Sequence, residues 1–163
     1  MTMENELKYT SQYGQDKWLV ESHFKHLKNG YFVDVAAGNG IFLSNTYVFE
    51  HNLGWTGICV EANDDTYAEL TKIRNLCDNN CILDDGSVVN FNNTTNSTGW
   101  EHLLSGIDGL VHYATVNDST VSKTTISLQT LLDNHTAPDI IDYISMDIEG
   151  AELQVLTEFF KTN

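Results

Sequence analysis

The sequence predicts an α/β fold built on a mostly parallel sheet. Two observations support this fold class. Short apolar runs, too short for helices, alternate with segments whose apolar residues follow helical spacing. The runs at 31–36, 57–61 and 140–146 are also nearly continuous in apolar residues, as expected of parallel strands buried on both faces. Strands that alternate with helices are typical of a parallel sheet covered by helices.

The helices are predicted from capping residues and apolar spacing. The first begins after Ser11 or Gln12 and ends at Gly30. Capping residues at 44–46 begin a helix that runs to about 52, and Asn63 caps another that runs to about 76. The remaining predicted elements are strands near 80–83, 88–91, 110–115 and 124–127, and helices near 128–134 and 151–161.

Length and charge limit the classes of function. The 163 residues fit one domain over 1–163, and 41% apolar residues suffice for a core. With 8 Lys+Arg against 23 Asp+Glu, the net charge of −15 argues against nucleic acids and anionic membranes as partners. No apolar run approaches the roughly 18 residues of a membrane span. Three cysteines and a polar start predict reduced thiols in the cytoplasm.

The turn after the first predicted strand is the most informative segment. Glycines there allow a ligand to approach the backbone closely at a strand–helix junction. Dinucleotide-binding turns need a third glycine, and Leu43 stands at that position. Enzymes that use S-adenosylmethionine favour an acid at the strand end and small residues at alternate positions, which Asp34, Ala36, Gly38 and Gly40 supply. Asp34 is then expected to hold the cationic amino end of the ligand.

Glu61 lies 21 residues beyond Gly40, at the end of the next predicted strand. An acid at this position can accept hydrogen bonds from both ribose hydroxyls of a nucleoside. The alternative, a tight turn followed by an unrelated surface glutamate, stays open at this point. The residues predicted to bind the cofactor are Asp34, Ala36, Gly38, Asn39, Gly40 and Glu61.

A second acidic group follows the last predicted strand. Because ligands of open α/β sheets sit at the carboxyl ends of the strands, Asp147 and Glu149 are expected to face the same crevice as Gly38. Either carboxylate is a candidate to position or deprotonate an acceptor hydroxyl, and both are the predicted catalytic residues. Helix capping is the alternative for Asp147, and for Glu152 the two roles are evenly balanced. Three carboxylates also suit a hard cation, but we expect no metal site.

Taken in order, these segments resemble the FkbM-type S-adenosylmethionine-dependent methyltransferases. The resemblance implies a Rossmann-like class I methyltransferase fold and methylation of a hydroxyl on a sugar, glycan or small molecule. It also implies that Asp34, Gly38 and Gly40 hold the methionine end of the cofactor, and Glu61 its ribose. The role of the segment 11–16 stays open between closure over the cofactor and helix capping. The segments that carry the resemblance are 11–16, 32–40, 44–46, 54–61 and 141–152.

Two features depart from the family pattern. Ala36 stands where glycine is usual, and the chain stops at Asn163, where family members continue with further strands. The expected sheet therefore lacks the usual C-terminal strands and exposes a strand edge. A naturally shortened member, a fragment, and a homodimer that pairs the open edge are the open interpretations. The rival functions are a catalytically inactive cofactor-binding or interaction module and a nucleotide-binding oxidoreductase.

Overall fold

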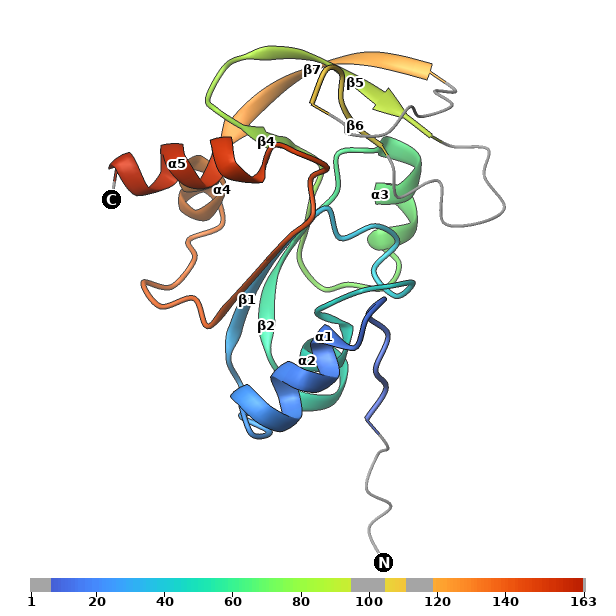
Figure 1. Ribbon diagram of the computed structural model, residues 1–163, viewed down its shortest axis with the longest axis vertical. Coiled ribbons are helices and arrows are strands. Elements are labelled where there is room, and N and C mark those ends of the chain that lie inside the picture. Colours follow the sequence, from blue (N-terminus) through green and yellow to red (C-terminus); the bar gives the residue numbers. More distant parts are fainter. Residues whose placement is uncertain (1–6, 95–104, 111–118, 163) are drawn as a thin grey trace, which may run out of the picture.

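The computed structural model describes residues 7–94, 105–110 and 119–162. Its helices are α1 (Gln15–Trp18), the π-helix η1 (Leu19–His23), α2 (Tyr47–Leu53), α3 (Asp64–Leu70), α4 (Leu128–Asn134) and α5 (Glu152–Thr162). Its strands are β1 (Tyr31–Val35), β2 (Thr56–Val60), β3 (Cys77–Asp78), β4 (Cys81–Leu83), β5 (Val88–Asn93), β6 (Gly106–Ile107), β7 (Ser119–Ser127) and β8 (Tyr143–Met146). In Figure 1, β1 and β2 lie in the middle of the molecule. The helices α1 and α2 lie toward one end of these strands, and β5 and β7 lie toward the other.

Among the described residues, the central sheet has the order β3-β2-β1-β8, and every neighbouring pair is parallel. This confirms the predicted α/β architecture with a parallel sheet. In the register of the sheet, Val35 lies opposite Val60 on one side and opposite Met146 on the other. The strands β1, β2 and β8 therefore end at the same level, and the residues that follow them emerge at one edge.

A second sheet has the order β4-β7-β5-β6. The strand β7 pairs antiparallel with β5 and parallel with β4. Lys123 of β7 bonds Asp64 of α3 at 2.7 Å, and His135 after α4 bonds Asp78 of β3 at 2.7 Å. These contacts join the second sheet and α4 to the central sheet. The predicted strand near 110–115 lies almost entirely outside the described residues, and β6 is formed by an earlier segment.

Two hydrophobic clusters form the core, because alternate residues of β1 point to opposite faces of the central sheet. Phe32 packs with Phe49 of α2, Trp55 and other buried side chains on one face. Val33 and Val35 pack on the other face, with residues of β4, α4 and α5. Side chains therefore cover both faces of the sheet at β1, which accounts for the nearly continuous apolar sequence of this strand.

Two predicted helices end earlier in the structure than in the sequence pattern. The first stops at His23, and Lys25, His26 and Asn29 adopt positive φ angles before β1. In α3, Asn63 caps as predicted, since its side chain accepts bonds from the N–H groups of Asp65 and Thr66, but the helix ends at Leu70. The predictions near 128–134 and 151–161 agree with α4 and α5.

The segment after α3 turns inward and buries Arg74, the only arginine of the chain. The Nε of Arg74 donates to Glu50 of α2, and its Nη1 donates to the Gly40 carbonyl oxygen at 3.1 Å. Its Nη2 donates to the Thr46 hydroxyl at 2.8 Å, and that hydroxyl donates to Asp34 at 2.6 Å. The guanidinium group therefore connects α2, the segment 40–46 and β1.

Removal of the Glu50 carboxylate should destabilise the protein strongly, because Arg74 would stay buried without its ionic partner. We expect Glu50→Ala to lower the free energy of unfolding by about 3–5 kcal/mol, measured by urea denaturation. The matched control is Glu69→Ala, which breaks the exposed Lys72–Glu69 pair and should cost about 1 kcal/mol or less. Similar decreases in the free energy of unfolding of the two variants would show that the buried pair stabilises the protein no more than the exposed one.

Candidate functional site

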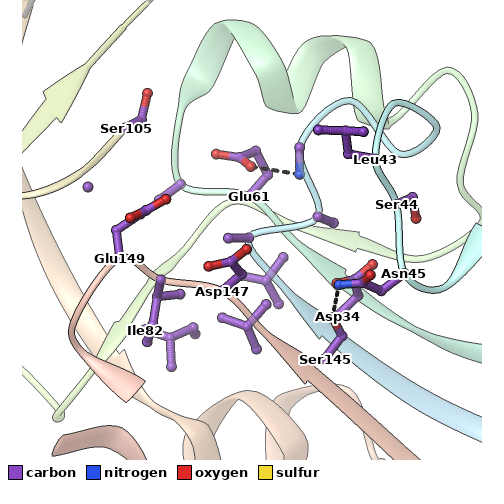
Figure 2. Close-up of a pocket in the computed structure, with 18 of the residues that line it drawn as sticks. Asp34, Leu43, Ser44, Asn45, Glu61, Ile82, Ser105, Ser145, Asp147 and Glu149 are labelled. Atoms are coloured by element: carbon purple, nitrogen blue, oxygen red, sulfur yellow. Dashed lines mark hydrogen bonds between the residues drawn. The ribbon is translucent and has the colours of Figure 1, made fainter. Parts of the chain in front are cut away.

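The carboxyl ends of β1, β2 and β8 open into a cavity of about 880 Å³. Ala36, Glu61 and Asp147, the first residues after these strands, line it. Figure 2 shows Glu61, Asp147 and Glu149 around the cavity, with Asp34, Asn45 and Ser145 at one end. The second sheet supplies an apolar wall formed by Ile82, Phe91 and Ile107.

The cavity is strongly acidic. Asp34, Glu61, Asp147 and Glu149 line it, whereas no Lys, Arg or His is among the described residues that do so. Carboxylates gathered in a partly desolvated space create a negative potential, because a low dielectric screens them less than water does. A ligand that carries positive charge is therefore favoured in this cavity.

The turn after β1 runs through left-handed backbone conformations, which strain Ala36 but not the two glycines. Ala36, Gly38 and Gly40 have φ angles of +67°, +56° and +84°. The turn is held by a bond from the Ala37 N–H to the Val60 carbonyl oxygen at 2.9 Å. Left-handed residues expose successive backbone N–H groups and concentrate at ligand-binding turns, which agrees with the predicted role of the segment.

Two residues predicted to bind a cofactor lie outside the cavity lining. The Asn39 side chain folds back onto its own turn and accepts bonds from the N–H groups of Ile41 and Phe42. At Gly40, an added Cβ would meet Arg74 Cγ and Leu70 Cδ1, each at 2.8 Å. A glycine at this position therefore also permits the turn to pack on the buried arginine, and its contact with a cofactor stays a prediction.

Glu61 is buried at the end of β2, and its carboxylate already has two backbone partners. Its Oε2 accepts a bond from the Gly38 N–H at 3.0 Å, and its Oε1 accepts one from the Asn63 N–H at 2.8 Å. Burial raises the pKa of Glu61 to about 7, although these two N–H groups oppose the shift. Each carboxylate oxygen keeps a second lone pair with which it can accept a bond from a ligand.

Asp34 is almost fully buried within β1. Its Oδ2 accepts the Thr46 hydroxyl at 2.6 Å, and Ser145 of β8 also hydrogen-bonds it. Burial raises the pKa of Asp34 above its ordinary value, while the nearby Arg74 guanidinium and the two hydroxyls oppose the shift. The carboxylate thus has protein partners and reaches the cavity from its floor.

The loop after β8 presents Asp147 and Glu149 to the cavity. Glu152 organises this loop, because its Oε1 accepts the Ile148 N–H at 2.9 Å and its Oε2 accepts the Gly150 N–H at 3.0 Å. Glu152 is the first residue of α5 and fixes the loop that precedes the helix, and it is not among the residues that line the cavity. Asp147 precedes α5 by five residues and does not cap it. Partial burial, and then the Glu152 carboxylate, raise the pKa of Asp147 above its ordinary value.

The segment 11–16 contributes to the cavity, whereas α1 begins after Gly14 without a side-chain cap, so closure over a cofactor stays a prediction. The buried Asp16 carboxylate accepts the Ser11 hydroxyl at 2.6 Å and the Thr10 N–H at 2.6 Å, which fixes the chain before α1. Ser11 also forms a bridge with Leu43, beside the turn after β1. From this position Gln12, Tyr13 and Gln15 line the cavity.

Three residues that matter at the site were missed by the sequence reasoning. Arg74 is the only arginine in an acidic chain, a signal that was present but unused. Ser145 lies opposite Asp34 in the register of β1 and β8, so a polar residue inside the last apolar run was the available signal. Asn45 was considered only as part of the segment 44–46, for capping and for the family resemblance, although it lines the cavity.

Other kinds of site receive no support from the described part of the chain. Among those residues, no three His, Cys, Asp or Glu side chains are grouped so that they could hold a metal ion, and no helix is long and apolar enough to cross a bilayer. The cysteines Cys59, Cys77 and Cys81 are free thiols. Burial raises the pKa of the Cys81 thiol, which lines the cavity, to about 11.

The substitution Ala36→Gly should stabilise the protein, because a left-handed φ costs alanine about 1 kcal/mol that glycine does not incur. We expect the free energy of unfolding to rise by roughly 0.5 kcal/mol after the entropy of glycine is counted. The neighbouring Ala37→Gly is the control and should destabilise, since Ala37 is buried and has no positive φ. Destabilisation by both substitutions would contradict the assigned strain.

Comparison with known proteins agrees with this geometry. The family model described as the methyltransferase FkbM domain matches residues 34–162, which include the turn after β1, Glu61 and the Asp147 loop. No curated protein and no solved structure matches the chain. The family match covers most of the sequence and confirms the resemblance found in the sequence: the chain belongs to the FkbM methyltransferase domain family.

Proposed function

We propose that this protein is an S-adenosylmethionine-dependent O-methyltransferase of Rossmann-like class I architecture. Its acceptor is a hydroxyl on a sugar, a glycan or another small molecule. The observation that carries the proposal is the acidic cavity at the aligned strand ends of a methyltransferase family member. The free cysteines support a reducing compartment such as the cytoplasm.

The cavity residues fit the proposed methyl donor in shape and charge. A volume of about 880 Å³ suits a nucleoside with an amino-acid side arm together with a small acceptor. The remaining lone pairs of Glu61 suit the two ribose hydroxyls, and the apolar wall of Ile82, Phe91 and Ile107 suits a purine ring. The surrounding carboxylates favour a sulfonium and an ammonium group.

The chain supplies positioning and proton transfer, whereas the bound donor supplies an electrophilic methyl group. Glu61 and the turn after β1 orient the donor, which favours an in-line approach of the acceptor oxygen. Asp147 is the proposed base: it lies at the cavity edge, and its raised pKa makes its carboxylate a better proton acceptor than an ordinary aspartate. Glu149 lies beside it, where it can orient the acceptor hydroxyl.

Calorimetric titration with S-adenosylhomocysteine tests the proposal. The protein should bind at micromolar levels, about −8 kcal/mol, and Glu61→Ala should weaken binding at least tenfold by removing the acceptors for ribose. NADH serves as the comparison ligand and should not bind. Failure of a folded protein to bind S-adenosylhomocysteine, or a preference for NADH, would contradict the proposed cofactor.

Donor affinity should depend on pH near neutrality. Since the free protein holds the pKa of Glu61 at about 7 and the carboxylate is the proposed acceptor, affinity should be constant well above pH 7. Below pH 7 it should fall by up to tenfold per pH unit. Glu61→Gln, titrated over the same range, should lack the step at pH 7. An unchanged profile in this variant would remove Glu61 from the account.

Protein stability provides the internal check on this experiment. The folded-state pKa of Glu61 lies above its ordinary value of 4.5, so this carboxyl destabilises the fold when ionised. Its contribution to stability therefore improves as pH falls from about 7 toward 4.5. As pH falls over that range, Glu61 should make the fold more stable while donor affinity decreases. A loss of affinity there is therefore not caused by an effect of Glu61 on folding.

The substitution Asp147→Asn should slow methyl transfer by roughly 10²–10⁴-fold while donor affinity changes little, because only the proton acceptor is lost. Formation of S-adenosylhomocysteine with an acceptor selected from a panel of sugars and polyols gives the rate. Asp65→Asn makes the same charge change at an exposed site of α3 outside the cavity and should leave the rate unchanged. Unimpaired transfer in Asp147→Asn would exclude Asp147 as the base.

A further inference from the structure

Asn45 carries an unsatisfied buried acceptor at the edge of the cavity. Its Oδ1 is buried and has no hydrogen-bond partner in the described part of the chain, and the residue lines the cavity. Figure 2 shows the Asn45 side chain close to Asp34 and Ser145. Buried polar atoms in proteins are nearly always paired, so an unpaired one beside a cavity indicates a bond that a ligand completes.

The neighbouring hydrogen bonds determine which end of the amide faces Ser145. The Asn45 Nδ2 donates to the Ser145 hydroxyl oxygen at 3.1 Å. Ser145 has one proton, and its bond with Asp34 uses that proton, since this bond lowers the pKa of Asp34 and favours the carboxylate that accepts it. The Tyr143 hydroxyl also hydrogen-bonds Ser145. With its proton on Asp34, Ser145 can only accept from Asn45, so the amide presents its NH₂ group there. Its carbonyl oxygen is left for the cavity.

The charge around this oxygen selects the kind of donor. Asp34 lies opposite Ser145 in the register of β1 and β8, and Asp147 directly follows Met146, the last residue of β8. No cationic side chain is among the described residues that line the cavity. A neutral donor would satisfy the oxygen, but a cationic one gains the attraction of both carboxylates as well. The arrangement therefore suits an ammonium group.

We propose that Asn45 Oδ1 accepts a hydrogen bond from the ammonium group at the amino-acid end of the methyl donor. This inference rests on the proposed function and refines the role predicted for Asp34. Asp34 has Thr46 and Ser145 as its own partners, so it acts on the ammonium group through its charge and orients Asn45 through Ser145. Asn45 makes the direct contact.

A ligand pair that differs only in the amino-acid end tests the assignment. S-adenosylhomocysteine carries the ammonium group, whereas 5′-methylthioadenosine keeps the nucleoside and the thioether without it. The substitution Asn45→Leu retains the side-chain size. Calorimetry with the full chain should show that it weakens the binding of S-adenosylhomocysteine about tenfold or more. The same substitution should weaken 5′-methylthioadenosine binding less than twofold, because this ligand lacks the group that Asn45 is proposed to contact.

The matched control is Asn45→Asp, which keeps an acceptor oxygen but loses the bond that the amide donates to Ser145. It should retain more S-adenosylhomocysteine affinity than Asn45→Leu. Equal losses in the two variants would assign the effect to the amide N–H and contradict the proposal. So would equal weakening of both ligands by Asn45→Leu, or an unchanged affinity, which would mean that internal water satisfies the oxygen.

These outcomes separate the inference from the proposed function. A wild-type protein that binds neither ligand would overturn both, because no methyl donor would then occupy the cavity. A wild-type protein that binds both ligands, with Asn45→Leu indistinguishable from it, would leave the proposed cofactor in place and overturn only the role of Asn45.

Discussion

The buried guanidinium group of Arg74 is the interaction on which the arrangement of the site depends. It joins Glu50 of α2, the carbonyl oxygen of Gly40 and the hydroxyl of Thr46, which no strand pairing connects. Through Thr46 it also reaches Asp34 in the central strand. A buried charge persists only with such partners, so the folded chain has to keep these segments together. The turn that faces the cavity is fixed as a consequence.

This cation lies behind the cavity rather than in it. Arg74 lowers the cost of burying Asp34, yet the cavity itself keeps its acidic lining, because no described cationic side chain lines it. Desolvation then raises the pKa values of Asp34, Glu61 and Asp147, while N–H and hydroxyl groups oppose the shift at the first two. The protein therefore carries a free-energy cost for the desolvated carboxylates at the strand ends. Groups with shifted pKa values are common at functional sites.

Much of the central sheet could be predicted from the sequence because the signals are local. Apolar runs identify β1, β2 and β8, and parallel register then requires that the residues after them meet at one edge. Asp34, Ala36, Gly38, Glu61, Asp147 and Glu149 all line the cavity, as that reasoning expects. Their roles in binding and catalysis stay predictions. Capping by Asn63 was predictable for the same reason, since its bonds are made within three residues.

The rest depends on contacts between distant residues, which no local pattern encodes. The second sheet forms because Cys81 pairs with Thr125, far along the chain. The side of Gly40 where a side chain would lie faces Arg74, a packing reason for glycine that the local glycine pattern does not reveal. The bond between Asn45 and Ser145 spans 100 residues, and only the fold brings the two together.

A crystal structure with bound S-adenosylhomocysteine would test whether the aligned strand ends form a site for a methyl donor. We expect the ribose hydroxyls within hydrogen-bond distance of Glu61, with the bonds from the Gly38 and Asn63 N–H groups retained. We also expect the sulfur between the turn after β1 and Asp147. A ligand bound outside the cavity, or ribose hydroxyls that do not contact Glu61, would contradict the account.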